Sequence, residues 1–520
     1  MKYLILFALF LSFALAQAQK GEYWVFFKDK KDVEFDPYTY FDSKAIERKL
    51  KANISLNHIT DYPINENYKT AVLDLSESTT GETRWFNAIA VWAYPNQIEA
   101  ISKLPFVKST ELIRSESHLA EKKINMKLSN DYKFMLKKQI EGMQGSKFKN
   151  AGFTGKGIRI AVFDGGFPKV DKHPAFEHLR ENNRIIDTWD FVKEKPFVYD
   201  YSSHGTATLS CIAGITKGKQ MGLANDAEFL LARTEKNTEP FSEEVNWMQA
   251  MEWADKKGAD IISSSLGYTH HRYFINDMDG KTSLVTRAAN MAAAKGMIVV
   301  NSMGNEGDIE WKYMGAPADA DSILSIGGID PFTDYHINFS SYGPTADKRL
   351  KPNVVGYGHA ITASKTNITD SYGTSFSAPL IAGFVACAWQ ANPDKTNMQL
   401  MREIEKSGHL YPYYDYAHGY GMPQAGYFTK TNKKETPETL FNFEEKENVV
   451  SIVLNDNQQS YFSIGANKVY YHIRQSDGFI LEYALVEPYQ KEVVSISKDK
   501  LQGGNILAVF FNGYYAEFTR

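Results

Sequence analysis

Short apolar runs bounded by Gly or Asp recur through the middle of the chain. They lie at 158–163, 229–232, 261–266, 297–300 and 323–326. Longer stretches with helical spacing of apolar positions separate several of them, most clearly at 242–257 and 283–295. Short buried strands that alternate with amphipathic helices are typical of βαβ units. The pattern therefore predicts an α/β fold with a mostly parallel β-sheet and helices on both faces.

The two ends of the chain have different patterns. Residues 20–115 combine alternating apolar runs with helix-like stretches at 43–51 and 97–104, which predicts a small α+β domain. A polar segment, 116–131, follows it. Beyond a second polar segment at 429–438, short runs such as 449–454 alternate apolar and polar residues. Aromatic residues are frequent there, so we expect a small antiparallel, β-sandwich-like domain.

The first residues have the pattern of a secretory signal peptide. Lys2 gives a short positive region, 3–15 is apolar, and small residues follow at Ala14, Ala16 and Ala18. A membrane anchor or a buried N-terminal helix is the alternative, but the apolar run is short for a bilayer and lacks a polar flank. We therefore expect an exported protein, secreted, periplasmic or at the cell surface, without stable membrane insertion.

Composition narrows the function further. The 520 residues are 43% hydrophobic and 23% charged, an ordinary balance for a globular protein of several domains. The net charge of −4 is too small and too mixed to indicate a nucleic-acid partner. Two cysteines, Cys211 and Cys387, exclude a disulfide-rich scaffold. Both lie in apolar helical stretches, so we expect buried free thiols, although export leaves a disulfide possible.

Two polar residues follow predicted strands or open predicted helices. Asp164 comes directly after the strand at 158–163 and is followed by two glycines. His204 opens a helix-like stretch and is followed by Gly205. In parallel sheets, chemistry gathers at the carboxyl ends of the strands. A carboxylate there can orient a neighbouring side chain, whereas a structural cap and an ordinary surface or core histidine are the alternatives.

Two further residues have the same kind of position. Ser375 precedes the apolar helix-like run 380–390, where backbone N–H groups favour negative charge. Gly373 permits a close approach, and we expect Pro379 in the first helical turn, where an N–H lacks a partner anyway. Asn305 follows the strand at 297–300 and could donate to an oxyanion. Capping roles are the alternative for both Ser375 and Asn305.

These residues together resemble a known family, the subtilisin-like serine peptidases (subtilases). The order Asp164, His204, Ser375 is the subtilase order. Asn305 in Gly-Asn-Glu-Gly resembles the oxyanion asparagine of the family, and Gly-Thr-Ser-x-Ser-x-Pro at 373–379 resembles its nucleophile signature. The resemblance covers about residues 125–430. It departs at Gly165–Gly166, Ala207–Thr208 and Phe376, none of which removes a reacting group.

The resemblance implies a serine endopeptidase that hydrolyses peptide bonds through an acyl-enzyme on Ser375. His204 would act as general base, Asp164 would orient it, and Asn305 would bind the oxyanion with the Ser375 N–H. Because His204 must be neutral to accept a proton, activity should fall as the pH drops through its titration. A catalytically silent subtilase-fold binding or scaffold protein is the alternative. A lipase or esterase would need a Gly-x-Ser-x-Gly motif, which is absent around Ser375.

The resemblance also implies the partners and the binding residues. Protein or peptide substrates would bind along Ser265, Leu266 and Gly267. Further pocket walls are expected from Ser302, Met303 and Gly304 and from 316–318, whose small residues predict a roomy apolar pocket. The N-terminal domain would be a propeptide that acts as an intramolecular inhibitor, with a permanent accessory domain as the alternative. The expected boundaries are 1–18 for the signal peptide, 19–122 for the propeptide-like domain, 123–430 for the peptidase domain and 438–520 for the C-terminal β-domain.

No metal or cofactor is expected to be required for catalysis. Structural Ca²⁺ is possible in the loops that carry Asp277 and Asp279, or Asp319 and Asp321. Loop aspartates are more often simply solvated, so neither pair is assigned as a site. The role of the C-terminal β-domain and the substrate preference stay open.

Overall fold

The computed structural model describes residues 20–115, 132–236, 242–270, 272–430, 438–455 and 467–520. The predicted signal peptide and the polar segment 116–131 lie outside these residues. Within the described part of the chain, no helix is long and apolar enough to cross a membrane. The chain divides into two compact units, of which the first comprises Met1–Ile124, Phe191–Glu194 and Thr234–Gly258, and the second the remainder.

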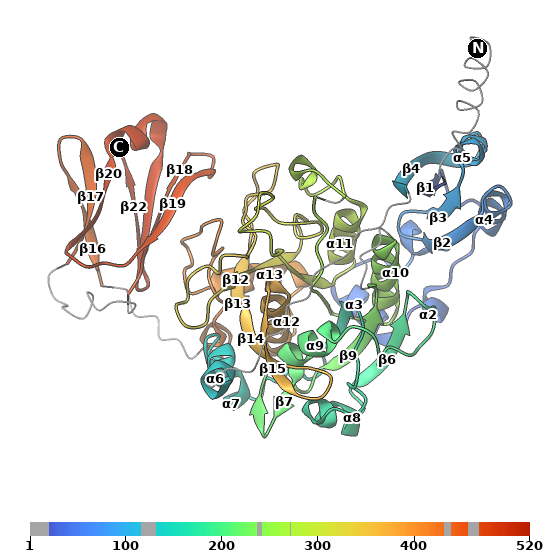
Figure 1. The fold of residues 1–520 in the computed structure, drawn as a ribbon, viewed down its shortest axis with the longest axis horizontal. Coiled ribbons are helices and arrows are strands. Elements are labelled where there is room, and N and C mark those ends of the chain that lie inside the picture. Colours follow the sequence, from blue (N-terminus) through green and yellow to red (C-terminus); the bar gives the residue numbers. More distant parts are fainter. Residues whose placement is uncertain (1–19, 116–131, 237–241, 271, 431–437, 456–466) are drawn as a thin grey trace, which may run out of the picture. The chain divides into compact units, whose positions relative to one another are not determined.

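The first unit contains a four-stranded antiparallel sheet in the order β2-β3-β1-β4. Its strands are β1 (Gly21–Phe27), β2 (Ser78–Thr83), β3 (Ala88–Ala93) and β4 (Val107–Ser115). Its helices are α2 (Pro37–Tyr40), α3 (Ser43–Lys51), α4 (Glu66–Leu73) and α5 (Pro95–Ser102), drawn in blue in Figure 1. Apolar side chains of β1 and β3 pack with Val72 and Ile101 into one core. This confirms the predicted α+β domain.

Helix α10 (Glu243–Lys256) belongs to the same unit and contacts this domain through polar groups. Asp255 bonds to the Arg48 guanidinium, and its Oδ2 lies 3.1 Å from Lys49 Nζ, all three side chains being buried. Glu252 accepts hydrogen bonds from the Thr83 hydroxyl and from the backbone N–H groups of Arg84 and Trp85. Burial raises the pKa of the Glu252 carboxyl. A charged and hydrogen-bonded contact therefore joins the α+β domain to α10.

The second unit is built on a seven-stranded sheet in the order β13-β12-β11-β10-β5-β9-β6, in which every neighbouring pair is parallel. The strands are β5 (Arg159–Asp164), β6 (Ile185–Asp190), β9 (Glu228–Arg233), β10 (Ile261–Ser264), β11 (Ile298–Ser302), β12 (Leu324–Ile329) and β13 (Val354–Tyr357). All residues of β10 to β13 are buried, as expected for a parallel sheet that is covered on both faces. The predicted α/β fold is confirmed.

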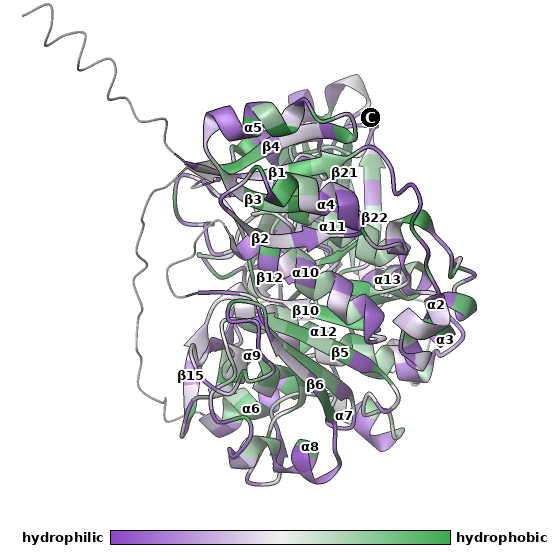
Figure 2. Ribbon diagram, turned by 90° about the vertical axis from the view of Figure 1, so that its right-hand side faces the viewer, coloured by the Kyte–Doolittle hydropathy of each residue, from purple (hydrophilic) through white to green (hydrophobic). Residues whose placement is uncertain are grey.

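Helix α12 is the central helix of this unit. It packs against α9 and against the strands β10 to β13, and its residues are mostly hydrophobic in Figure 2. The helices of the unit are α6 (Tyr132–Glu141), α7 (Gly145–Asn150), α8 (Glu177–Glu181), α9 (His204–Ala213), α11 (Leu284–Ala294), α12 (Thr374–Ala391), α13 (Asn397–Lys406) and α14 (Ala425–Phe428). Two antiparallel pairs complete it, β7 (Ile215–Thr216) with β8 (Lys219–Gln220), and β14 (His359–Ala363) with β15 (Ile368–Tyr372).

The C-terminal residues form two antiparallel sheets, β16-β17-β20 and β19-β18-β21-β22. Their strands are β16 (Phe441–Glu445), β17 (Val449–Leu454), β18 (Val469–Arg474), β19 (Ile480–Val486), β20 (Glu492–Ser497), β21 (Ile506–Phe511) and β22 (Tyr514–Thr519). One core contains buried apolar side chains from both sheets, among them Phe441, Ile452 and Val509. The predicted antiparallel domain is confirmed.

Buried histidines lie where the loop at 408–420 meets β18. The Nδ1–H of His472 donates to Tyr414 O over 2.6 Å, and Tyr413 packs against Tyr470. His418 belongs to this loop, and His336 lies beside it. Burial lowers the pKa of His336 to about 3 and that of His472 to about 4. These imidazoles therefore stay neutral in the folded chain at mildly acidic pH.

This neutrality makes stability dependent on pH. Below about pH 6.5 the unfolded chain protonates these histidines while the folded chain does not, so the free energy of unfolding falls with the pH. Each such histidine should cost about 2 kcal/mol between pH 7 and pH 5. Urea unfolding of the Ser375→Ala chain at the two pH values measures this loss. His336→Gln should reduce it, and replacing the exposed His58 should not; equal losses in the two variants would contradict the account.

Candidate active site

A buried carboxylate and an imidazole meet at the carboxyl end of the parallel sheet. Asp164 is the last residue of β5 and is fully buried. Its oxygens accept from the Gly165 N–H at 2.7 Å and the Thr208 hydroxyl at 3.1 Å. The Nδ1 of His204 lies 2.9 Å from Oδ2 and 3.0 Å from Oδ1. A carboxylate in this position accepts the Nδ1–H, which leaves Nε2 of His204 as a proton acceptor.

Backbone packing explains how His204 reaches Asp164. His204 is the first residue of α9, and Gly205 follows it inside the helix. A Cβ atom at Gly205 would lie 2.3 Å from Gly166 O and 2.9 Å from Asp164 Cβ. Because only glycine fits there, the helix start can approach the end of β5.

Ser375 and Asn305 are brought together by the start of α12. Ser375 is the second residue of the helix, after Gly373 with a φ of +142°. Asn305 Oδ1 accepts from the Thr374 N–H at 2.9 Å and the Thr374 hydroxyl at 3.1 Å. The amide oxygen of Asn305 is thus anchored, and its Nδ2 lies beside Gly373, 3.6 Å from the position of an added Cβ.

Pro379 does not lie in the first helical turn, so that prediction is wrong. It is the sixth residue of α12 and lacks the N–H that would donate to the carbonyl of Ser375. Ser265 replaces that donor, because its hydroxyl donates to Ser375 O over 2.9 Å. In return the Ser375 hydroxyl donates to Ser265 O over 3.3 Å. The missing helix bond therefore fixes Ser375 to the segment after β10.

The expected substrate-binding segments also come together. Ser265, Leu266 and Gly267 follow β10, and Ser302, Met303 and Gly304 lie at the end of its parallel neighbour β11. Asn301 Nδ2 donates to Leu266 O over 2.9 Å and so links the two segments. Ala316, in the third expected segment, exchanges two backbone hydrogen bonds with Tyr268.

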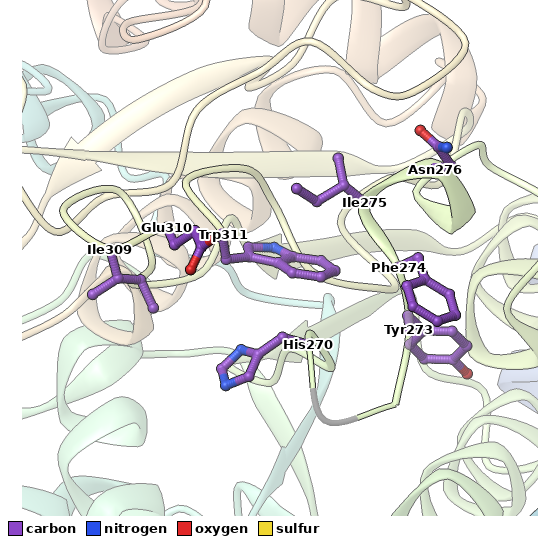
Figure 3. Close-up of a pocket in the computed structure, with 8 residues that line it drawn as sticks. All are labelled: His270, Tyr273, Phe274, Ile275, Asn276, Ile309, Glu310 and Trp311. Atoms are coloured by element: carbon purple, nitrogen blue, oxygen red, sulfur yellow. The ribbon is translucent and has the colours of Figure 1, made fainter.

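The residues of an apolar pocket were not predicted from the sequence. Its volume is about 480 Å³, and Figure 3 shows the Trp311 indole lying between Ile275 and His270. The pocket is lined by His270, Tyr273, Phe274, Ile275, Asn276, Ile309, Glu310 and Trp311, and by none of the expected wall residues. Phe274 is 80% exposed. The sequence feature that could have indicated this pocket is a cluster of aromatic residues in a loop that is otherwise rich in polar residues.

Three of the four candidate calcium aspartates accept hydrogen bonds from nearby backbone N–H groups. Asp277 accepts from the Phe274 N–H, and Asp279 accepts from the N–H groups of Lys281 and Thr282. Asp319 accepts from the Gly280 N–H and the Thr286 hydroxyl. Among the described residues, no group of three or more His, Cys, Asp or Glu side chains is arranged to hold a metal ion. Cys211 and Cys387 are buried free thiols, as predicted.

The Ser265 contact gives a test that depends on Pro379. Ser265→Ala leaves the Ser375 carbonyl without a donor and should lower the free energy of unfolding by about 1–3 kcal/mol. In a Pro379→Ala background the new N–H can donate to that carbonyl, so the same substitution should cost less. Urea unfolding of the four chains measures the difference. Ser102→Ala, at an exposed helix end, is the control for loss of a serine–carbonyl bond. Equal costs in both backgrounds would show that Ser265 does not replace the helix bond.

Comparison with known proteins identifies the family. The Subtilase family model (Peptidase S8) matches residues 155–435, and the model of the Peptidase S8 propeptide domain of Bacteroidota matches residues 22–130. A solved structure, the epidermin leader peptide processing serine protease (EpiP) from Staphylococcus aureus, has a TM-score of 0.56 at 15% identity. It covers 81% of this chain and 100% of its own, which shows a similar fold.

Curated relatives match over part of their length. The chain is 26% identical to Subtilisin-like protease SBT6.1 of Arabidopsis thaliana, over 74% of this chain and 37% of that protein. It is 29% identical to human membrane-bound transcription factor site-1 protease, over 47% of this chain and 22% of that protein. The chain thus spans well under half the length of these two relatives. With Subtilisin BL of Lederbergia lenta the identity is 26%, over 52% of this chain and 89% of that one. Since the family model spans more than half of the chain and includes the Asp164, His204 and Ser375 positions, the protein belongs to the subtilase family.

Proposed function

We propose that this protein is an exported serine endopeptidase that hydrolyses peptide bonds through an acyl-enzyme on Ser375. The observation that carries the proposal is the buried Asp164 carboxylate held against His204 Nδ1. Helix α9, which begins at His204, packs against α12, which begins at Thr374 and carries Ser375. The acid, the base and the hydroxyl thus lie on packed elements of one unit.

In the proposed reaction, Ser375 Oγ attacks the scissile carbonyl while His204 Nε2 takes the hydroxyl proton. His204 then gives that proton to the leaving amine, and water repeats the sequence on the ester. Asp164 holds the Nδ1–H tautomer and stabilises the imidazolium without itself becoming protonated. Because its carboxylate is buried and has two other donors, it cannot turn away from the ring.

Asn305 and the start of α12 would stabilise the oxyanion. The Asn305 amide oxygen accepts two hydrogen bonds from Thr374. These bonds fix the orientation of the amide, and its Nδ2 group stays available as a donor. The Ser375 N–H lies in the first turn of α12, where backbone donors lack helical partners. Removing one donor of this kind costs about 3–4 kcal/mol of transition-state stabilisation.

The N-terminal domain would act as an intramolecular inhibitor. Its match to a propeptide model and its buried ion pairs with α10 support this role.

The pocket of Figure 3 supports a substrate with a bulky apolar side chain. Ile309, which lines the pocket, donates its N–H to Glu306 O over 3.2 Å, and Glu306 follows Asn305 in the chain, so the pocket lies close to the proposed oxyanion site.

A fluorophosphonate probe tests the proposal on the purified full-length chain. The wild type should be labelled and should lose about a hundred N-terminal residues on a gel, about the size of a small domain. Ser375→Ala should do neither, because it lacks the hydroxyl that reacts. Heat-denatured wild type controls for non-specific labelling.

Absence of labelling in the folded wild type would refute the proposal that the protein is an active serine endopeptidase. The catalytically silent binding or scaffold protein would then be the better account. Labelling without a change of size would keep the peptidase and make the N-terminal domain a permanent accessory domain.

A further inference from the structure

Four aromatic side chains form a continuous row that leads away from Ser375. The row, called here the aromatic strip, consists of Phe134, Phe332, His359 and Tyr372. The rings of Phe134 and Phe332 stack with centroids 5.6 Å apart, Phe332 lies 6.0 Å from His359, and His359 stacks on Tyr372 at 4.0 Å. Three of the four are open to solvent: Phe134 is 48%, Phe332 52% and Tyr372 44% exposed. Adjacent exposed aromatic rings are unusual on a soluble protein and indicate a contact surface.

Hydrogen bonds hold the outer half of the strip in place. Phe332 lies in a turn in which Asp330 Oδ1 accepts from the N–H groups of Phe332 at 3.0 Å and Thr333 at 2.9 Å. Lys138 of α6, the helix that carries Phe134, forms an ion pair of 3.1 Å with Asp334 at the end of this turn. The two phenylalanines are therefore fixed relative to each other.

The inner half is fixed by the hairpin of β14 and β15. His359 and Tyr372 are directly opposite each other in this pair of strands. His359 Nε2 lies 3.0 Å from Asp370 Oδ1, and the imidazole is buried beneath the Tyr372 ring. Tyr372 is the last residue of β15 and precedes Gly373, Thr374 and Ser375. The strip thus begins three residues before the proposed nucleophile.

The elements that carry the strip indicate which half of a peptide substrate binds there. A peptide leaves the scissile bond in two directions, and the acyl half is expected along Ser265, Leu266 and Gly267, which follow β10 of the main sheet. The strip belongs to different elements, the β14–β15 hairpin, the Asp330 turn and α6. We propose that the aromatic strip binds the leaving-group half of the substrate and selects bulky apolar or aromatic side chains there. This inference rests on the proposed function.

Spacing and exposed aromatic surface support this occupant. Side chains on one face of an extended peptide repeat every two residues, or about 6.7 Å, comparable to the 5.6 Å between the centroids of the exposed Phe134 and Phe332 rings. Beside the strip, Lys138 forms an ion pair with Asp334, and His359 Nε2 lies 3.0 Å from Asp370 Oδ1. The exposed rings of Phe134, Phe332 and Tyr372 offer aromatic faces, which suit aromatic rings and aliphatic chains at alternate positions of a peptide.

Acyl transfer to added peptides isolates the leaving-group side. The processed enzyme, obtained from the full-length chain, is acylated with a chromogenic ester, and Ala-Phe-Ala-Phe-amide or Ala-Ala-Ala-Ala-amide is added. The acceptor amine attacks the ester carbonyl, the bond to Ser375 Oγ breaks, and His204 passes the proton from the amine to Ser375 Oγ. The ratio of peptide product to hydrolysed acid should favour the Phe acceptor about tenfold, because apolar contact of this size is typically worth that much. Phe332→Ala and Phe134→Ala should each reduce the preference about threefold, while hydrolysis of the acyl-enzyme stays unchanged.

A matched control is Leu481→Ala, which removes an apolar side chain of similar exposure from β19. It should leave the acceptor preference unchanged. A burst of acylation shows an active peptidase. If that enzyme has no preference for the Phe acceptor, or if Phe332→Ala does not alter the preference, the proposal that the strip binds substrate is wrong. If the two Phe variants change only self-association, a second copy of the chain binds the strip. If they change only the loss of the N-terminal residues, the N-terminal domain binds it. Either result would show that the proposal is wrong. Absence of any acylation burst would instead refute the proposed function, on which the strip depends.

Discussion

The site depends on one buried interaction, the carboxylate of Asp164 held against the imidazole of His204. A buried carboxylate is costly unless its oxygens are paired, and here a backbone N–H, a hydroxyl and the Nδ1 of His204 surround it. That arrangement requires the end of β5, the start of α9 and the glycine at 205 to lie within contact distance. The parallel sheet supplies this geometry because its strands end at a common edge.

The sequence predicted the parts of the molecule that depend on local pattern. The alternation of apolar runs and helical stretches predicted the α/β sheet, and Asp164 and His204 fall at the strand end and helix start where they were expected. What it missed depends on distant contacts. The position of Pro379 within α12 and the Ser265 hydroxyl that replaces its missing bond involve residues more than a hundred positions apart. The pocket around Trp311 and the aromatic strip likewise join segments that no local pattern connects.

Two other junctions use buried polar groups in different ways. Between the N-terminal domain and α10, Arg48 and Lys49 surround Asp255. Such a contact is specific, because removal of Asp255 would take a partner from two buried cations. Where the loop at 408–420 meets β18, the buried carboxylate of Asp415 accepts from the Tyr413 hydroxyl and lies beside His418.

The most direct test of the central account is the rate at which a fluorophosphonate reacts with Ser375 in wild type and in Asp164→Asn. The asparagine keeps the shape of the site but favours the wrong tautomer of His204, so the rate should fall by about 10⁴-fold. Thr208→Val, which removes one hydrogen bond and keeps the carboxylate, should lower the rate far less. Equal rates in wild type and Asp164→Asn, with both chains folded, would show that the Asp164–His204 pair does not activate Ser375.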